Sequence, residues 1–89
     1  MLKRELKIVN RLGLHARASA KVVQLASRFR SNVALVFNGR RADARSIIAV
    51  MLLAASMDAT IYVEANGPDE ADAVSAIAQL INDRFGEGS

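Results

Sequence analysis

One short stretch of the sequence combines residue types that could bind and transfer an anion: Gly13-Leu14-His15-Ala16-Arg17. The apolar pattern changes from alternating to helical just after it, which predicts that His15 lies at or beside a helix N-cap. Unpaired backbone N–H groups and the helix dipole favour an anion at such a position. Arg17, in the first turn, can present its guanidinium to the same anion, and Gly13 permits a tight turn before the helix.

His15 is the only histidine in the sequence. A neutral imidazole has a nucleophilic nitrogen, and a phosphoryl group placed on it would lie over the helix amides and next to Arg17. This arrangement predicts a phosphohistidine site that needs no metal and no cofactor, provided that the imidazole is exposed. The motif itself offers no general base, no second carboxylate and no oxyanion hole. We therefore expect one half of a transfer reaction, with a partner supplying the rest, and not an enzyme.

Two other interpretations stay open on these residues alone. A histidine near a helix start is commonly a capping or surface residue, so the chain could be an interaction domain in which His15 is inert. It could also be a small α+β module that binds RNA or DNA through basic residues. Against the second interpretation, aromatic content is only 4%, and no Phe or Tyr is spaced with basic residues as a base-stacking platform requires.

Length and composition limit the class of protein. A chain of 89 residues that is 52% hydrophobic, with one proline, predicts a single folded domain over residues 1–89. The absence of cysteine excludes disulfides, thiol chemistry and cysteine zinc sites. The longest apolar run, Ile47 to Ala55, is nine residues, about half of the roughly 18 that cross a bilayer. The charged amino end lacks a signal-peptide pattern, so we expect a soluble cytoplasmic protein without membrane insertion.

The charge is divided unevenly along the chain. Residues 1–57 contain eleven Lys or Arg and two acidic residues, a net charge of +9, whereas residues 58–89 carry −6. A basic first part predicts contact with an acidic partner or a phosphate.

The elements that position the motif follow from apolar spacing. Period-two alternation predicts a first strand over residues 2–9, and helical spacing from Ala16 predicts a helix that ends at Ser31-Asn32. Asn38-Gly39, between apolar and basic runs, predicts a hairpin of strands 33–37 and 40–43.

The second half of the chain continues the pattern. Ser46 is a good N-cap for a short helix over the apolar run that follows it, and residues 60–65 alternate as a fourth strand. After a turn at residues 66–70, a last amphipathic helix is expected to run to Phe85, with Gly86 and Gly88 ending it. The order β-α-β-β-α-β-α predicts an α+β open-faced sandwich.

Two stretches resemble the signatures of a known family. Residues 13–20 closely resemble the phosphorylation-site signature of the HPr family, the histidine-containing phosphocarriers of the bacterial sugar phosphotransferase system. Residues 45–54 resemble the second signature of that family at the expected spacing. The resemblance extends over essentially the whole chain, including the Gly67-Pro68 turn. It implies a four-stranded antiparallel sheet covered on one face by three helices, and a monomer.

The resemblance also implies roles for individual residues. His15 matches the histidine that accepts a phosphoryl group at Nδ1 from phosphorylated enzyme I and passes it to a histidine of an enzyme IIA. Arg17 matches the arginine that neutralises that group. Ser46 matches the serine that HPr kinase/phosphorylase modifies in many members, although Arg45 stands where lysine is frequent. Ala18 replaces a common proline, and alanine still favours the helix.

The resemblance further implies a partner-binding surface. Apolar residues near the motif would dock partners, with basic residues around them for acidic surfaces such as enzyme I; the residues expected there are Leu14, Ile47 and Met51, with Arg11, Arg17, Lys21 and Arg45 around them. The alternative is that the apolar residues of this short helix belong to the core. Sugar uptake and a nitrogen-related regulatory branch of the same family both remain open.

Overall fold

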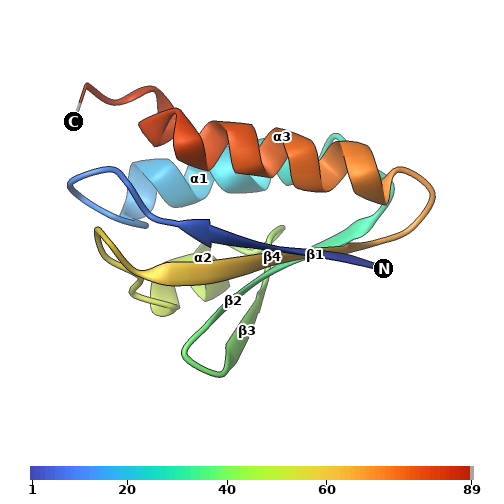
Figure 1. Cartoon of the computed structure of the whole chain (residues 1–89), viewed down its shortest axis with the longest axis horizontal. Coiled ribbons are helices and arrows are strands. Elements are labelled where there is room, and N and C mark those ends of the chain that lie inside the picture. The colour runs from blue at the N-terminus through green and yellow to red at the C-terminus, as the bar shows by residue number, and fades with distance from the viewer. Residues whose placement is uncertain (89) are drawn as a thin grey trace.

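A four-stranded antiparallel sheet forms the base of the fold in the computed structural model, which describes residues 1–88. Its strand order is β1-β4-β2-β3, and helices connect or follow the strands (Figure 1). The elements are β1 (Leu2–Lys7), α1 (Ala16–Ala26), β2 (Asn32–Phe37), β3 (Arg40–Asp43), α2 (Ile47–Leu52), β4 (Thr60–Asn66), α3 (Glu70–Asn82) and the 3-10 turn η1 (Arg84–Gly86). The predicted open-faced α+β sandwich with three helices is confirmed.

The register of the sheet separates a buried face from a polar one. Leu6 of β1 lies opposite Ile61 of β4, and Leu35 of β2 lies opposite Val63, so these side chains share one face and all are buried. On the other face, Glu64 forms ion pairs with Arg41 and Lys3. Because side chains alternate along a strand, one pairing register fixes both faces at once.

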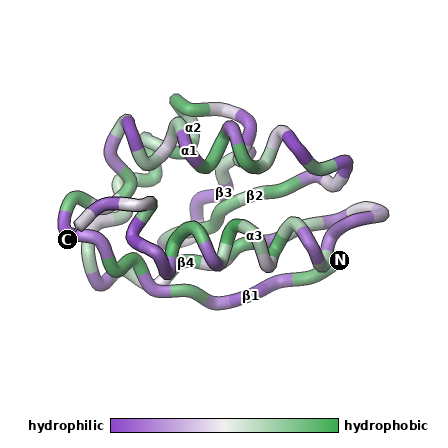
Figure 2. Tube along the Cα trace, turned by 90° about the horizontal axis from the view of Figure 1, so that it is seen from above, coloured by the Kyte–Doolittle hydropathy of each residue, from purple (hydrophilic) through white to green (hydrophobic). Residues whose placement is uncertain are grey.

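Helices α1 and α3 lie side by side over the buried face of the sheet (Figure 1). Each helix alternates between apolar and polar residues along its length (Figure 2), and its apolar stripe points to the core. The apolar helical residues fully or nearly fully buried there are Ala18, Val22 and Ala26 of α1 and Ala73, Val74, Ile77, Ala78 and Ile81 of α3. The third helix, α2, packs beside α1 and against the edge strand β3. No helix within residues 1–88 is long and apolar enough to cross a membrane.

Two local predictions are confirmed in detail. Asn38 and Gly39 have φ of 54° and 79°, so the β2–β3 hairpin turns through two left-handed residues as an Asn-Gly turn requires. Ser46 is the N-cap of α2, and its side chain accepts a hydrogen bond from the Ala49 backbone N–H at 3.2 Å.

The two long helices are shorter than the sequence predicts. The first ends at Ala26, where Ser27 caps the last turn with a hydrogen bond from its hydroxyl to the Val23 carbonyl at 2.7 Å. The last ends at Asn82, because Arg84 and Phe85 take left-handed φ of 55° and the chain leaves the helical path. Phe85 is nevertheless fully buried, so its apolar character reflects the core rather than a helix that continues.

Candidate functional site

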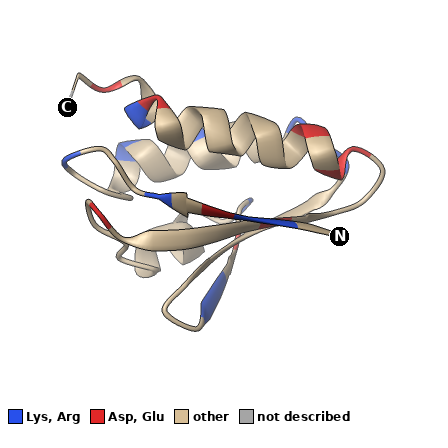
Figure 3. Cartoon of the chain, viewed as in Figure 1, with Lys and Arg blue, Asp and Glu red and all other residues tan. Residues whose placement is uncertain are grey.

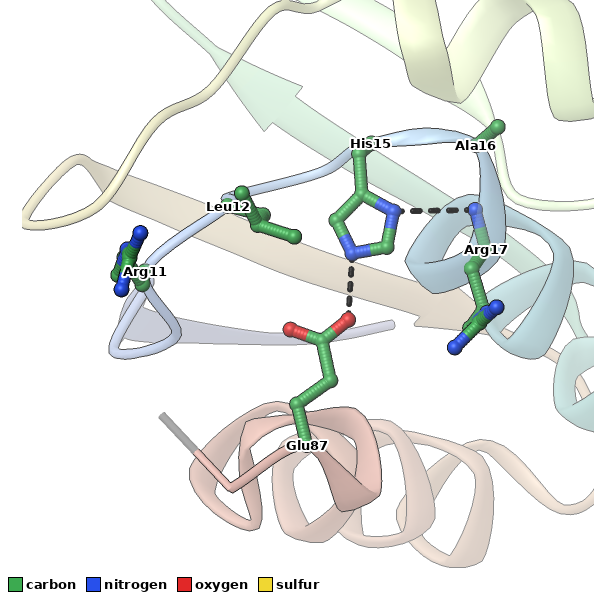
Figure 4. A pocket seen from close by; sticks show the side chains of 6 residues that line it. All are labelled: Arg11, Leu12, His15, Ala16, Arg17 and Glu87. Carbon is green, nitrogen blue, oxygen red and sulfur yellow. Dashed lines mark hydrogen bonds and ion pairs between the residues drawn. The ribbon is translucent and has the colours of Figure 1, made fainter.

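His15 is the N-cap residue of α1, as the sequence predicts. Its carbonyl accepts the first helical hydrogen bond, from the Ser19 N–H at 2.9 Å. Its ring turns back over the first turn, where Nδ1 accepts a hydrogen bond from the backbone N–H of Arg17 at 3.1 Å (Figure 4). One nitrogen of the imidazole is therefore directed at the part of the helix where N–H groups lack intrahelical partners.

The loop before His15 is held tightly. Gly13 has φ of +64°, and a Cβ there would lie 2.5 Å from the Ala55 carbonyl oxygen, so only glycine fits without a shift. The next residue, Leu14, donates its N–H to that same carbonyl at 2.9 Å, and its own carbonyl accepts from the Ser19 hydroxyl at 3.1 Å. These contacts fix the direction in which the backbone enters α1.

A carboxylate from outside the motif, which itself offers no second carboxylate, contacts the other nitrogen of His15. Oε2 of Glu87 forms a short contact with Nε2 of His15 (Figure 4). The other oxygen of Glu87 accepts from Nδ2 of Asn10 at 3.0 Å, and the same amide donates to the Gly13 carbonyl at 2.9 Å. The sequence reasoning missed Glu87 because it is 72 residues from His15 and follows the last helix.

The electrostatic surroundings of Glu87 favour its ionised form. Burial alone would raise its pKa, but hydrogen bonds from Asn10 and His15 and electrostatic attraction from His15 and Lys21 outweigh that effect. The pKa of Glu87 consequently lies below its ordinary value. At neutral pH the group beside Nε2 is a carboxylate.

The imidazole is less exposed than the sequence predicts, since 26% of its side-chain surface is accessible. It borders an open surface pocket that is also lined by Arg11, Leu12, Ala16, Arg17 and Glu87. The side chains of Arg11 and Arg17 stand on opposite sides of the ring (Figure 4). Both nitrogens have partners, yet the ring is accessible from this pocket and Nδ1 is engaged only by one N–H of ordinary length.

Charged side chains of both signs lie at the end of the molecule that carries the loop before α1 (Figure 3). Lys and Arg lie in the loop before α1 and at the start of α1, whereas the first turn of α3, at the opposite end, is acidic (Figure 3). Around His15 itself, the cations that an approaching anion would meet are Arg11 and Arg17, which line the pocket together with the Glu87 carboxylate.

Two of the basic residues predicted to contact partners form hydrogen bonds within the chain. Lys21 donates from Nζ to the carbonyl of Phe85. Arg45 donates from Nη2 to the carbonyls of Phe29 at 2.7 Å and Ser31 at 3.3 Å. Each of these hydrogen bonds links one segment of the chain to another.

The apolar residues predicted as partner contacts fall into two groups. Leu14 is 4% exposed and lies in the core, so the expectation that it contacts partners is corrected. The side chain turns inward because the loop that carries it is bonded to the Ala55 carbonyl. Ile47 and Met51 are 40% and 37% exposed on α2. The sequence reasoning missed two further exposed apolar residues of that helix, Ile48 and Leu52, and the exposed Leu12 in the His15 pocket.

Among residues 1–88, no group of three or more His, Cys, Asp or Glu side chains is arranged to hold a metal ion. The chemistry available is that of one imidazole, helix amides, guanidinium groups and a carboxylate. An open-faced sandwich with an imidazole at a helix N-cap suits a small protein that carries an anionic group on histidine. The chain matches the family model described as "PTS HPr component phosphorylation site" over residues 2–83. It belongs to the HPr family, the phosphocarrier proteins of the phosphotransferase system.

Similar proteins agree over the full length. The chain is 54% identical to the phosphocarrier protein HPr of Cupriavidus necator over 88 residues, which are 99% of each chain. It is 49% identical to that of Neisseria meningitidis serogroup B, again over 99% of each. Relatives with this name carry phosphoryl groups, so the chain is a phosphocarrier rather than an enzyme, and its family implies enzyme I and enzyme IIA as partners. Family membership also decides between a phosphocarrier and a nucleic-acid-binding module.

Solved structures give the same fold. The crystal structure of HPr-C-His from Thermoanaerobacter tengcongensis is 36% identical, covers 100% of both chains and has a TM-score of 0.95. The crystal structure of an HPr dimer from the same organism is 37% identical, covers 98% of this chain and 100% of that one, and has a TM-score of 0.78.

Proposed function

We propose that His15 accepts a phosphoryl group on Nδ1 from the phosphohistidine of enzyme I and passes it to a histidine of an enzyme IIA. The Nδ1 lone pair forms the new bond to phosphorus while the bond from phosphorus to the donor nitrogen breaks and leaves its electron pair on that nitrogen. In the second transfer a nitrogen of the enzyme IIA histidine forms the bond to phosphorus while the bond from phosphorus to Nδ1 of His15 breaks and leaves its electron pair on Nδ1.

The observation that carries this proposal is the hydrogen bond from the Arg17 N–H to Nδ1. An N–H that meets Nδ1 identifies the position where an oxygen of the phosphoryl group would lie once the nitrogen is occupied. That position is beside the first turn of α1, where the helix dipole and free amides stabilise negative charge. The exposed guanidinium of Arg17 borders the same pocket and can balance the charge.

The direct test is labelling with enzyme I and phosphoenolpyruvate. The wild-type chain should acquire one acid-labile phosphate, and His15→Ala should acquire none while its circular dichroism stays that of the wild type. Ser46→Ala is the matched control and should be labelled at the wild-type rate. Absence of label on the wild-type chain, or label that persists in His15→Ala, would refute the proposal.

We also propose that the exposed apolar face of α2 docks these partners. Ile47 and Met51 are both exposed on this face, and Arg11 and Arg17 line the His15 pocket, so the surface suits a partner with an acidic rim. The double variant Ile47→Ala/Met51→Ala should raise the KM of enzyme I for this chain about tenfold, with little change in kcat. Leu2→Ala, equally exposed at 40% but on β1, is the control and should leave KM unchanged; an unchanged KM in the double variant would contradict the proposal.

Ser46 is a candidate regulatory site. It is partly exposed directly before Ile47, and a phosphate there would add a charge of roughly −1.5 to −2 beside the proposed docking surface. We propose that HPr kinase/phosphorylase modifies it and that the added charge repels acidic partners. Incubation with that kinase should label the wild type and His15→Ala but not Ser46→Ala; equal labelling of Ser46→Ala would contradict this role.

We propose that residues 1–89 form one domain that acts as a monomer in the cytoplasm. β1 pairs with β4 of its own chain from Leu2 to Lys7, and the buried apolar residues form one core. The phosphoenolpyruvate that phosphorylates enzyme I is an intracellular metabolite. Light scattering after size-exclusion chromatography should give the mass of one 9.6 kDa chain; a mass of two chains would overturn the proposed state.

A further inference from the structure

We propose that Glu87 is a positioning residue that selects the tautomer of His15 with the proton on Nε2 and thereby keeps Nδ1 available as the phosphoryl acceptor. The consequence for transfer rests on the proposed function, whereas the tautomer is a property of the free protein. The proposal starts from the two contacts of the ring, one at each nitrogen.

The two contacts agree with a single neutral form of the ring. Nδ1 faces an N–H donor, so it must present a lone pair. Nε2 faces an ionised carboxylate, which can only accept, so Nε2 must carry the proton. The opposite tautomer would set a proton on Nδ1 against the Arg17 N–H and a lone pair against the Glu87 carboxylate. A backbone amide and a distant carboxylate thus impose the same choice from opposite sides.

Glu87 is held in place by its surroundings. Asn10, which is fully buried, donates to the second carboxylate oxygen and so links Glu87 to the loop that carries His15. The tail is anchored just before it by Phe85, whose side chain is buried and whose carbonyl accepts from Lys21. Gly86 then takes φ of +77°, which turns the chain toward the histidine. The side chain of Glu87 is 16% exposed, as expected for a group held by such contacts.

A carboxylate in this position also suits the chemistry of transfer. When Nδ1 bonds to phosphorus, the Nε2 proton stays on the ring and the ring becomes cationic. Glu87 lies beside that proton, whereas the phosphoryl group would lie on the Nδ1 side with the Arg17 amide. The cationic ring then stands between two anions, and loss of the phosphoryl group restores the neutral tautomer without a change of proton.

The test combines a spectroscopic measurement with a rate. ¹⁵N NMR of the imidazole nitrogens should show the Nε2–H form as the dominant neutral tautomer in the wild type. Glu87→Ala should shift the population toward Nδ1–H and lower the rate of phosphoryl acceptance from phosphorylated enzyme I about tenfold, because one hydrogen bond to a charged group is lost. Glu87→Gln has the same size and retains an acceptor oxygen, so it should retain more of the Nε2–H form than Glu87→Ala.

Asp83→Asn is the matched control, because Asp83 is an exposed carboxylate a few residues earlier in the same segment. It should leave both the tautomer and the rate unchanged. Wild-type tautomer populations in Glu87→Ala, or a rate equal to or above that of the wild type, would overturn the proposal. Failure of the wild type to accept phosphate would refute the phosphocarrier mechanism instead, and the tautomer measurement would still decide the role of Glu87.

Discussion

Asp69 and Ser31 are 38 residues apart in the sequence, yet they form a reciprocal set of hydrogen bonds. The Asp69 carboxylate accepts from the Ser31 backbone N–H at 2.9 Å and from its hydroxyl, and the Ser31 hydroxyl oxygen accepts from the Asp69 N–H at 3.2 Å. Asp69 is the N-cap residue of α3, but its side chain makes no cap hydrogen bond. The carboxylate instead joins the start of α3 to the end of the turn after α1.

This relationship predicts a pH-dependent loss of stability in Asp69→Asn. Hydrogen bonds from Ser31 and the Arg30 N–H lower the pKa of Asp69 in the folded chain. The stabilisation is therefore present above the ordinary carboxyl pKa and is lost as pH falls through the lowered value. Urea midpoints should be lower for Asp69→Asn than for the wild type at pH 7 and should converge in acid. Asp72→Asn, exposed in the same helix, should show no such convergence; a constant difference for Asp69→Asn would contradict the argument.

Gly13→Ala should destabilise the chain more than Gly39→Ala. Both glycines have positive φ, +64° and +79°, but a Cβ at Gly13 would meet Ala55 and Ser56 backbone atoms at 2.5 and 2.8 Å, whereas Gly39 has nothing within 4 Å. The shared conformational strain costs about 1–2 kcal/mol, and the backbone clash adds about 1–3 kcal/mol at Gly13 alone. Chemical denaturation of both variants measures the difference. Equal losses in the free energy of unfolding would show that the loop at Gly13 shifts to accommodate the Cβ without cost.

Ser46→Ala should lower the free energy of unfolding by about 1 kcal/mol, because the hydrogen bond to the Ala49 N–H is lost from a six-residue helix. Ser46→Asn should lie close to the wild type, since asparagine is an equally good N-cap. Neither variant carries a hydroxyl that a kinase could modify, so a difference in stability between the two reports the cap alone. If Ser46→Ala and Ser46→Asn were equally destabilised, the cap would not be the cause.

Features governed by neighbouring residues could be predicted from the sequence. The hairpin at Asn38-Gly39 and the caps at His15 and Ser46 each depend on residues within a few positions, and strand alternation gave the buried face of β4. Helix ends were less predictable. Phe85 continues the apolar spacing of α3, but it lies after the end of that helix.

Contacts between distant segments could not be predicted in this way. Glu87 reaches His15 only because Phe85 and Gly86 redirect the tail, and no local pattern marks that path. Leu14 is adjacent to the site in sequence, but a hydrogen bond to the Ala55 carbonyl turns it into the core. Residues that lie near the motif in the sequence are therefore not all exposed to contact a partner.

Arg17→Ala should slow phosphoryl acceptance about 10- to 100-fold, because a charge-assisted hydrogen bond is worth about 1.5–3 kcal/mol and each 1.4 kcal/mol is tenfold in rate. The Arg17 backbone N–H that meets Nδ1 remains in the variant, so the ring should keep its orientation and some transfer should persist. Arg17→Lys should have a rate between those of the wild type and Arg17→Ala, since lysine keeps the charge but loses the planar fork.

Arg28→Ala removes an exposed cation just beyond the other end of α1 and controls for net charge. Rapid-quench measurement of the single-turnover rate from phosphorylated enzyme I distinguishes these variants; equal rates for Arg17→Ala and Arg28→Ala would mean that only the overall field of the protein matters.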